Sequence, residues 1–513
     1  MKLFNGFISA LVVSVFVLSG ILASTPAMAA DYAKQIIMAR NEDSRNLDPV
    51  TQDGNVNIWM FNLVLEGLVK TNNEGTKIEP ALAESWDVSE DGLTWTFHLL
   101  EGTKFSDGTP VKGEDWVWSL LRARDTEEST WKFALEAVAD VTAPDDKTVV
   151  VKLKEPWAPI LADLAMFNCT VQSKAYYNKL GAQAYTQKPL GTGPYMFAEW
   201  KKGEYMILKK NPHYRVVGLP KTETIRVNVV PDDNTRVMQL QAGAVDIITF
   251  VPYNRMNELN KDPNLKAVGV PSTSTRYIVL NNNVKPFDNV KVRKALQHGT
   301  NKEAIVAFVL HQYGEPAKGY APKSGLYYND DLKPYEYDVA KAKKLLAEAG
   351  YPNGFKTEIL VRSGNAVYEQ IATILKEQWA QIGVQADIQS LESATAVAKY
   401  RAMNHQVTLS GWTNDINDPS QQVNYVVLPG KAHKYYTDWT DTKAAAIAEA
   451  ANRELDPAKR EKMYKEIQAI HYDESPMIPV FHATYPVAMK KSIKGFVQTP
   501  LGNYRFENLV KEQ

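Results

Sequence analysis

The chain has 513 residues, of which 44% are hydrophobic and 10% aromatic, and its formal net charge is −1 at neutral pH. This composition is that of an ordered globular protein. The near-balance of charge gives no indication of a nucleic-acid partner or of a charged membrane surface. Because the length exceeds what one hydrophobic core usually supports, we expect two or more compact units.

The N-terminal segment has the pattern of a secretory signal peptide, which we place at residues 1–29. Lys2 supplies a short positive region, residues 7–22 are mainly apolar, and Ala27-Met28-Ala29 forms a small-x-small cleavage site. The apolar stretch is short for a bilayer-spanning helix, so a retained membrane anchor is the less favoured alternative. No cysteine lies near this site to carry a lipid. We therefore expect cleavage after Ala29 and a freely diffusing periplasmic protein.

Strand and helix patterns alternate along the rest of the chain, which indicates an α/β protein. A hairpin is expected over residues 86–99, with its turn at 89–92, because apolar residues alternate along the returning strand. Further elements follow from periodicity and from capping residues. These are helices over about 113–124 and 367–379, helices that begin after Asp232, Asp338 and Asp456, and strands over 222–230 and 245–250.

The search for catalytic, phosphate-binding and metal-binding motifs finds none with the required spacing. Residues 191–194 (GTGP) begin like a dinucleotide fingerprint, but Met196 stands where the third glycine belongs, so we interpret them as a structural turn. Residues 414–418 (NDIND) resemble a calcium loop only until Pro419, which replaces the glycine of the sharp turn. The single cysteine, Cys169, cannot form an intramolecular disulfide, and we expect it to be a buried small hydrophobe.

Several segments together resemble one known family, the extracellular solute-binding proteins of the peptide/nickel transporter type. The most diagnostic stretch of that family is similar to residues 80–86 (PALAESW), 91–97 (DGLTWTF) and 105–110 (FSDGTP), in the usual order and spacing. Similar segments continue along the chain at 189–195 (PLGTGPY), 211–214 (NPHY), 241–243 (QAG), 292–296 (VRKAL), 411–412 (GW) and 476–479 (PMIP). The resemblance therefore covers essentially the whole chain after the signal peptide.

The resemblance implies an α/β, two-lobed periplasmic-binding-protein clam of type II, with a hinge between the lobes. Lobe one would comprise residues 30–270, with an extra subdomain at about 73–189, and would be completed by residues 481–513. Lobe two would comprise residues 271–480. The two chain crossings of the hinge would lie near Val270-Pro271 and Ile478-Pro479.

The resemblance also implies a receptor that is not an enzyme. Such a protein captures a short peptide between its lobes and presents it to the permease of an ABC transporter in the inner membrane, and no bond is made or broken. We expect a monomer without cofactor or metal ion. A non-peptide solute, such as a nickel complex, a sugar or an opine, is the main alternative, and an enzyme or a folding helper is a weaker one.

Peptide receptors of this family bind the ammonium group of the ligand with an aspartate shortly after a Gly-Trp pair. Here that aspartate is Asp415, three residues beyond Trp412. Gly411, Trp412 and Thr413 would offer backbone hydrogen bonds to the ligand. The alternative is that Asp415 only caps the turn before Pro419.

Other ligand contacts are expected on both lobes. Asp53, Gly54 and Asn55 match the segment of lobe one that meets the ligand from the opposite side, and Trp131 falls where an aromatic pocket residue is usual, although it could equally belong to the core. In lobe two, the arginine with which dipeptide receptors bind a carboxyl terminus is missing from residues 365–370. The basic residues of broader oligopeptide receptors are replaced as well. Tyr400 and Leu409 stand at the places of those basic residues. We keep Tyr368, Tyr400 and Arg401 as candidate ligand contacts of lobe two.

Overall fold

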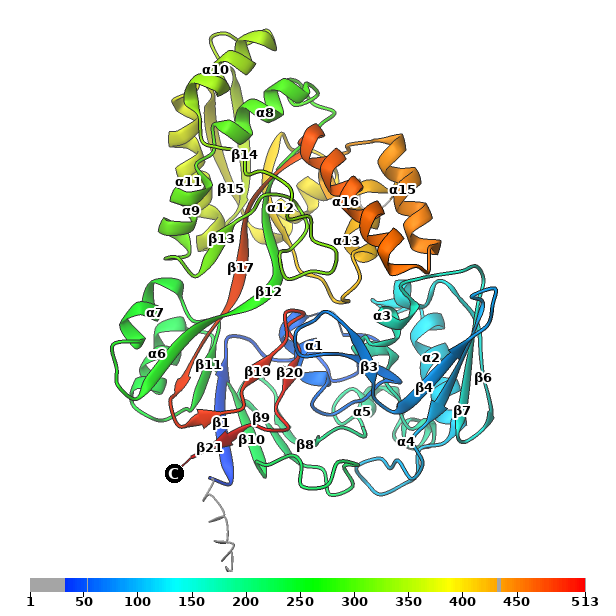
Figure 1. Cartoon of the computed structure of the whole chain (residues 1–513). Helices are drawn as coiled ribbons and strands as arrows, with labels where there is room; N and C mark the ends of the chain where they lie inside the picture. The colour runs from blue at the N-terminus through cyan, green and yellow to red at the C-terminus, as the bar shows by residue number, and fades with distance from the viewer. Residues whose placement is uncertain (1–32, 53, 431–434, 513) are drawn as a thin grey trace, which may run out of the picture. The chain divides into compact units, whose positions relative to one another are not determined.

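An 11-stranded mixed sheet organises the part of the chain that the computed structural model describes, residues 33–52, 54–430 and 435–512 (Figure 1). Most neighbouring strands are antiparallel, but β1 pairs in parallel with β10 and β11, and β14 pairs in parallel with β15 and β16. The strands in sheet order are β15 (Gln385–Leu391), β14 (Lys356–Arg362), β16 (Val407–Trp412), β12 (Leu265–Leu280), β17 (Met477–Lys490), β11 (Ile247–Thr249), β1 (Gln35–Arg40), β10 (Thr224–Val229), β9 (Tyr205–Lys210) and β8 (Tyr195–Lys201), with β13 (Gly314–Pro316) beside β17.

The two longest strands, β12 and β17, have 16 and 14 residues and pair with each other antiparallel along most of their length (Figure 1). Their register shifts between Pro271 and Thr275, which is the mark of a β-bulge. Both predicted chain crossings lie within these strands, Val270-Pro271 in β12 and Ile478-Pro479 in β17.

A second sheet of four antiparallel strands contains the predicted hairpin, whose turn and two strands are confirmed by the pairing of β4 with β5. Its strands in order are β4 (Ala83–Val88), β5 (Thr94–Leu99), β7 (Thr148–Leu153) and β6 (Val138–Asp145). Three short ribbons complete the strands: β2 (Val69–Thr71) with β3 (Ile78–Pro80), β18 (Ile493–Lys494) with β21 (Val510–Lys511), and β19 (Val497–Gln498) with β20 (Tyr504–Arg505).

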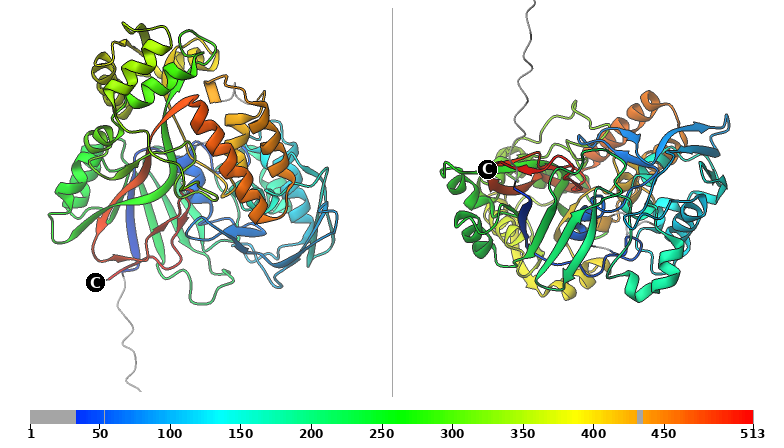
Figure 2. Two further views of the ribbon diagram at one scale, coloured as in Figure 1. Left: turned by 45° about the horizontal axis from the view of Figure 1, so that its top comes forward. Right: turned by 90° about the horizontal axis from the view of Figure 1, so that it is seen from below.

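Helices of the first half of the chain lie beside the strands β1 to β11 (Figures 1 and 2). They are α1 (Asn55–Phe61), α2 (Gly113–Asp125), η1 (Lys132–Leu135), α3 (Ile160–Leu164), η2 (Phe167–Cys169), α4 (Lys174–Leu180), α5 (Ala182–Tyr185), α6 (Asp233–Gln241) and α7 (Tyr253–Leu259). Those of the second half are α8 (Val290–His298), α9 (Lys302–Val309), α10 (Val339–Glu348), α11 (Ala366–Ala380), α12 (Ser393–Arg401), α13 (Ser420–Val427), α15 (Thr442–Arg453) and α16 (Pro457–Glu474).

The predicted helix starts are confirmed by capping hydrogen bonds. Asp232 accepts from the Thr235 N–H at 2.7 Å, Asp338 from that of Lys341 at 2.8 Å, and Asp456 from that of Ala458 at 2.8 Å. The two predicted strands that flank α6 are shorter than expected, because β10 and β11 keep only the residues that have a partner in the sheet.

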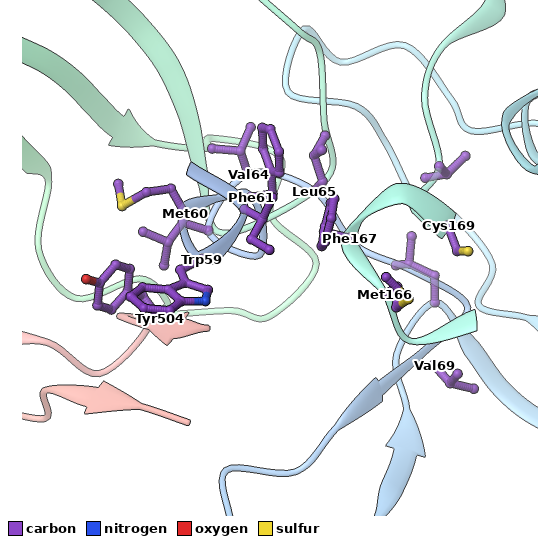
Figure 3. Packing of buried hydrophobic residues seen from close by; sticks show 14 of the residues in the cluster. Trp59, Met60, Phe61, Val64, Leu65, Val69, Met166, Phe167, Cys169 and Tyr504 are labelled. Carbon is purple, nitrogen blue, oxygen red and sulfur yellow. The ribbon is translucent and has the colours of Figure 1, made fainter. Parts of the chain in front are cut away.

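Four hydrophobic clusters form the interior. One is built mainly from residues 36–247 and 485–509 and also includes Ile416. Figure 3 shows part of it, where Trp59 lies beside Tyr504, and Phe61 stacks on Phe167 at a centroid distance of 5.8 Å. Cys169 is fully buried in this cluster, as predicted. Two clusters draw on residues 277–483, and a smaller one packs around α6 and α7.

The glycine-containing segment 191–194 is a structural turn. A Cβ added to Gly191 would lie 2.0 Å from the carbonyl oxygen of Val64, and the N–H of Gly193 donates to that same oxygen at 2.9 Å. Glycine is therefore needed here so that two stretches of backbone can approach each other.

Among the described residues, no helix combines the length and the hydropathy that a bilayer span requires. The predicted signal peptide lies outside the described residues.

Candidate functional site

The candidate site lies where two parallel strands of the large sheet end. β16 ends at Trp412 and β14 at Arg362, and the pairing of Leu360 with Thr408 places these two ends at the same edge. In α/β proteins, ligands commonly bind in the crevice beyond the carboxyl ends of parallel strands. The candidate residues Gly411 and Trp412 therefore stand where a ligand is expected.

Gly411 and Trp412 are held by contacts with neighbouring elements. The hydroxyl of Tyr435 donates to the carbonyl oxygen of Gly411, and a Cβ added to Gly411 would lie 2.6 Å from Nη1 of Arg276. The indole N–H of Trp412 donates to Oδ1 of Asn414 at 2.7 Å, and its ring lies 5.1 Å from that of Tyr425. Both residues are only partly buried, and Trp412 also packs against one of the hydrophobic clusters.

Beyond Trp412 the chain leaves the sheet and stays attached to β12. The N–H of Asn414 donates to Oγ1 of Thr273 at 3.0 Å, and Asn414 is buried. Thr413, between them, is partly exposed. This attachment fixes the start of the loop that carries Asp415.

Asp415 has a neutral partner and no cationic one. Nε2 of Gln421 donates to Oδ2 of Asp415 at 2.7 Å, and the N–H of Asp415 donates to Oε1 of Gln421 at 2.8 Å. Among the described residues, no lysine, arginine or histidine nitrogen lies within ion-pairing distance of this carboxyl. Asp415 is partly exposed. Burial raises the pKa of Asp415 to about 7, and the hydrogen bond from Gln421 opposes this only in part.

The capping role in this loop belongs to a different aspartate. Oδ1 of Asp418 accepts from the N–H of Ser420 at 3.0 Å, and the carboxylate of Asp418 forms a buried ion pair with Arg460 at 2.7 Å. Within the described residues, no backbone N–H donates to the carboxyl of Asp415. Asp418 thus supplies the bond to a backbone N–H, while the two hydrogen bonds between Asp415 and Gln421 hold the same turn across Pro419.

The candidate segment of the first half lies at the start of α1. Asp53 is outside the described residues, Gly54 precedes the first turn of α1, and Asn55 is exposed at its beginning. The indole N–H of Trp131 donates to the carbonyl oxygen of Gln52 at 2.6 Å, so Trp131 lies beside this segment. Its ring also packs on Phe167 at 5.4 Å, and it therefore contacts both the core and the candidate segment.

Two features connect the start of α1 with Asp415. Trp59 of α1 lies 4.9 Å from the ring of Tyr485, whose pKa is raised by burial and further by the negative charge of Asp415. In addition, a cavity of about 250 Å³ is lined by Gln421, the partner of Asp415, and by Phe133, which packs beside Trp131.

The candidate Tyr400 of the second half belongs to a row of aromatic side chains. Tyr400 lies 4.8 Å from Tyr436, Tyr436 lies 5.7 Å from Tyr435, and Tyr435 lies 5.4 Å from Trp412. Tyr368 is buried at the start of α11, with the guanidinium of Arg362 5.4 Å from its ring. Arg401 is exposed on α12, whereas Tyr368 is buried and Tyr400 is partly buried.

Three residues that contact the predicted segment were not recognised in the sequence: Arg276, Gln421 and Tyr435. Of the three, only Gln421 could have been suspected from the sequence, because it lies six residues after Asp415 in the first turn of a helix. Arg276 reaches Gly411 through the pairing of β12 with β16. No group of three or more histidine, cysteine, aspartate or glutamate side chains suited to a metal ion occurs in the part of the chain that the structure describes.

Comparisons with known proteins show the family and the fold of this chain. Residues 77–434 match the family described as bacterial extracellular solute-binding proteins, family 5 Middle. The heme-binding protein A of Haemophilus influenzae is 32% identical over 86% of this chain and 85% of its own length. The glutathione-binding protein of Escherichia coli (strain K12) is 30% identical over 95% of this chain and 97% of its own length.

A solved structure shares the fold. It is the ABC transporter-associated periplasmic binding protein from Helicobacter pylori in complex with the peptide STSA. It is 27% identical, with a TM-score of 0.79 over 94% of this chain and 99% of its own. The likeness confirms the predicted fold class, an α/β periplasmic-binding-protein clam.

Proposed function

Because the chain belongs to the bacterial extracellular solute-binding proteins of family 5, we propose that it is the periplasmic receptor of an ABC importer and that it captures a short peptide by its free ammonium group. The protein binds and presents its solute to the permease and catalyses no reaction. Secretion to the periplasm follows from the predicted signal peptide, with cleavage after Ala29.

The observation on which this proposal rests is the carboxyl of Asp415, which has a neutral partner and no cationic one among the described residues. Ionising a carboxyl group away from water is unfavourable unless a cation or several hydrogen bonds compensate for it. Gln421 supplies one hydrogen bond, and no described side chain supplies a cation. A ligand ammonium placed against Asp415 would supply the missing charge and would also be favoured by the poorly hydrated surroundings.

The surroundings of Asp415 suit a peptide in particular. Residues 411–413 are partly exposed and do not pair with β14, so backbone groups on that side can exchange hydrogen bonds with an extended ligand. The cavity beside Gln421 offers room for a side chain. Among the relatives, the names of the glutathione-binding protein and of the peptide-bound structure both indicate peptide ligands.

We place the hinge of this receptor at the paired strands β12 and β17. Lobe one then comprises residues 30–270 and 481–513, and lobe two residues 271–480. The β-bulge between Pro271 and Thr275 interrupts the ladder at this point, and the hydrophobic clusters on the two sides are largely separate. A few residues there can absorb the rotation that opens and closes the site.

The substitution Asp415→Asn tests this function. Removing one partner of a buried charge pair typically costs about 2 to 5 kcal/mol, so we expect the affinity for the co-purified solute to fall about 30-fold or more. Calorimetric titration measures this, and Asp232→Asn, at an exposed helix cap where Asn serves nearly as well, is the matched control. Equal affinity of wild type and Asp415→Asn would contradict the proposal and would favour a solute without an amine.

A further inference from the structure

Thr273 joins two segments of the chain that are far apart in the sequence. It is buried and lies in the β-bulge of β12, where the register with β17 shifts. Its backbone N–H donates to the carbonyl oxygen of Pro500 at 2.9 Å, and its hydroxyl oxygen accepts from the N–H of Asn414 at 3.0 Å. Pro500 belongs to the C-terminal part of lobe one, and Asn414 to the loop of lobe two that carries Asp415. One residue of the proposed hinge thus contacts both proposed lobes.

The carbonyl oxygen of Pro500 is held in place by its own surroundings. It lies in a tight turn, in which the N–H of Gly502 donates to the carbonyl oxygen of Thr499 at 2.8 Å. A Cβ added to Gly502 would lie 2.2 Å from the indole ring of Trp59 on α1, so the turn packs closely against that helix. The hydroxyl of Tyr485 also donates to the carbonyl oxygen of Pro500, at 3.2 Å. This oxygen is therefore a fixed point of lobe one.

The hydroxyl group of Thr273 is directed toward the loop of lobe two. Its oxygen lies 3.3 Å from the carbonyl oxygen of Pro500 and 3.4 Å from that of Asn414. A carbonyl oxygen offers two lone pairs, and the N–H of Thr273 together with the hydroxyl of Tyr485 can occupy both lone pairs of Pro500. The hydroxyl proton of Thr273 is thereby left for Asn414, whose N–H the same hydroxyl oxygen accepts.

Asn414 in turn determines where Asp415 stands. Asn414 is buried, and its Oδ1 atom accepts from the indole N–H of Trp412 at 2.7 Å. Asp415 is the next residue, and its backbone and carboxyl groups bond to Gln421 on its other side. The direction of the Asp415 carboxyl is thus set from one side by Gln421 and from the other side by the attachment of Asn414 to Thr273.

We propose that Thr273 is a positioning residue, which holds the loop of Asp415 at the hinge so that the carboxyl meets the ligand when the lobes close. This inference rests on the proposed function, because Thr273 affects ligand binding only through Asp415. A hinge residue that anchors the binding loop makes the closing rotation and the placement of the carboxyl one event. A carboxyl that is already in place also reduces the entropy that binding would cost.

The substitution Thr273→Val removes the hydroxyl and keeps both the branched shape and the N–H that bonds to Pro500. The probe is a casein hydrolysate, a mixture of short peptides with free amino termini, and the readout is the hydrolysate concentration that gives half of the full rise in melting temperature. We expect this concentration to increase about tenfold in Thr273→Val, because the N–H of Asn414 loses its acceptor and the loop its anchor. Thr273→Ser restores a hydroxyl and should recover most of the lost affinity.

A double-mutant cycle shows whether Thr273 acts through Asp415. In the Asp415→Asn background, Thr273→Val should change the half-saturating concentration by less than about twofold, because the carboxyl that Thr273 positions is already gone. Thr222→Val is the matched control. Thr222 is buried in lobe one, and its hydroxyl donates to the carbonyl oxygen of Leu509 at 2.6 Å, so its loss should leave peptide binding unchanged.

The outcomes separate this inference from the proposed function. Equal binding by Thr273→Val and wild type, or losses that multiply in the double variant, would overturn the positioning role and leave the proposed function intact. No rise in the melting temperature of wild type with the hydrolysate would overturn the proposed function and this inference with it. Melting curves without peptide establish that each variant is folded, and Thr273→Ala takes the place of Thr273→Val if the valine variant does not fold.

Discussion

Asp415 holds its proton more tightly than an ordinary aspartate, so a cationic ligand has to compete with protonation. With a pKa of about 7, the carboxyl of the ligand-free protein is mostly protonated at pH 6 and mostly ionised at pH 8. Only the ionised form attracts an ammonium group, and a bound ammonium lowers the pKa of its partner.

We therefore expect the affinity for the solute to fall about tenfold between pH 8 and pH 6, because only about a tenth of Asp415 is ionised at the lower pH. Binding near pH 7 should also release protons. Calorimetry at pH 7 in two buffers with different ionisation enthalpies measures that release. A constant affinity over this range, without proton release, would contradict the assignment of Asp415.

The same carboxyl should cost the ligand-free protein stability at alkaline pH. Its pKa is higher in the folded chain than in the unfolded chain, so the folded state holds more protons between about pH 4 and 7, and stability falls as the pH rises through that window. Asp415→Asn should then raise the unfolding free energy at pH 8 by about 1 to 2 kcal/mol and change it little at pH 4.5. Denaturant titrations at the two pH values measure this difference. A variant that is less stable than wild type at pH 8 would contradict the prediction that the ionised carboxyl destabilises the ligand-free protein.

At this scale, the sequence could point only to site residues that lie together in one segment. Asp415 was proposed because it follows Trp412 by three residues, and its role stays a prediction. Arg276 could not, because 135 positions separate it from Gly411 and only the pairing of β12 with β16 joins them. For Trp131, the sequence left open whether it lines the pocket or belongs to the core. Its contacts with Gln52 and with Phe167 are consistent with both roles.

Among the secondary-structure elements, the most local signals were the most reliable. Aspartates at helix starts and glycines with positive φ after helix ends, such as Gly243 and Gly350, need only nearby residues to act. Strand ends depend on partners elsewhere in the chain, which is why β10 and β11 were predicted too long. The great length of β12 and β17 was also not foreseen, because each strand is defined by its pairing with the other.

The close approach of residues 191–193 to Val64 gives an element-scale prediction. Gly191→Ala places a Cβ against a backbone carbonyl that cannot move aside, and we expect a loss of about 2 to 4 kcal/mol in unfolding free energy. Gly319→Ala, where the added Cβ meets only the end of the Leu332 side chain at 3.0 Å, should cost less than about 1 kcal/mol. Chemical denaturation of both variants compares them, and similar stabilities would show that the turn tolerates a side chain.

For the described chain as a whole, contacts join the two proposed lobes outside the hinge. Arg453 pairs with Glu155 at 2.7 Å, and the N–H of Ala158 donates to the carbonyl oxygen of Asn452 at 2.8 Å. Figures 1 and 2 both place α15 and α16 beside α3. The ion pair is half-exposed and is worth at most about 1 kcal/mol, so a ligand rather than these contacts has to favour closure.

Ligand binding should therefore compact the protein. Small-angle X-ray scattering of protein freed of solute, and of the same protein after solute is added back, measures the radius of gyration in the two states. We expect a smaller radius at saturation, because a ligand that contacts both lobes binds the closed state better. The same radius in both states would contradict the proposed hinge at β12 and β17.

Native mass spectrometry of the protein purified from the periplasm identifies the solute that the site retains, and so shows whether that solute is a peptide bound through Asp415. We expect a bound short peptide with a free amino group, present on wild type and largely lost from Asp415→Asn. A retained heme, metal complex, sugar or other solute without a free amine, bound equally by wild type and Asp415→Asn, would contradict it.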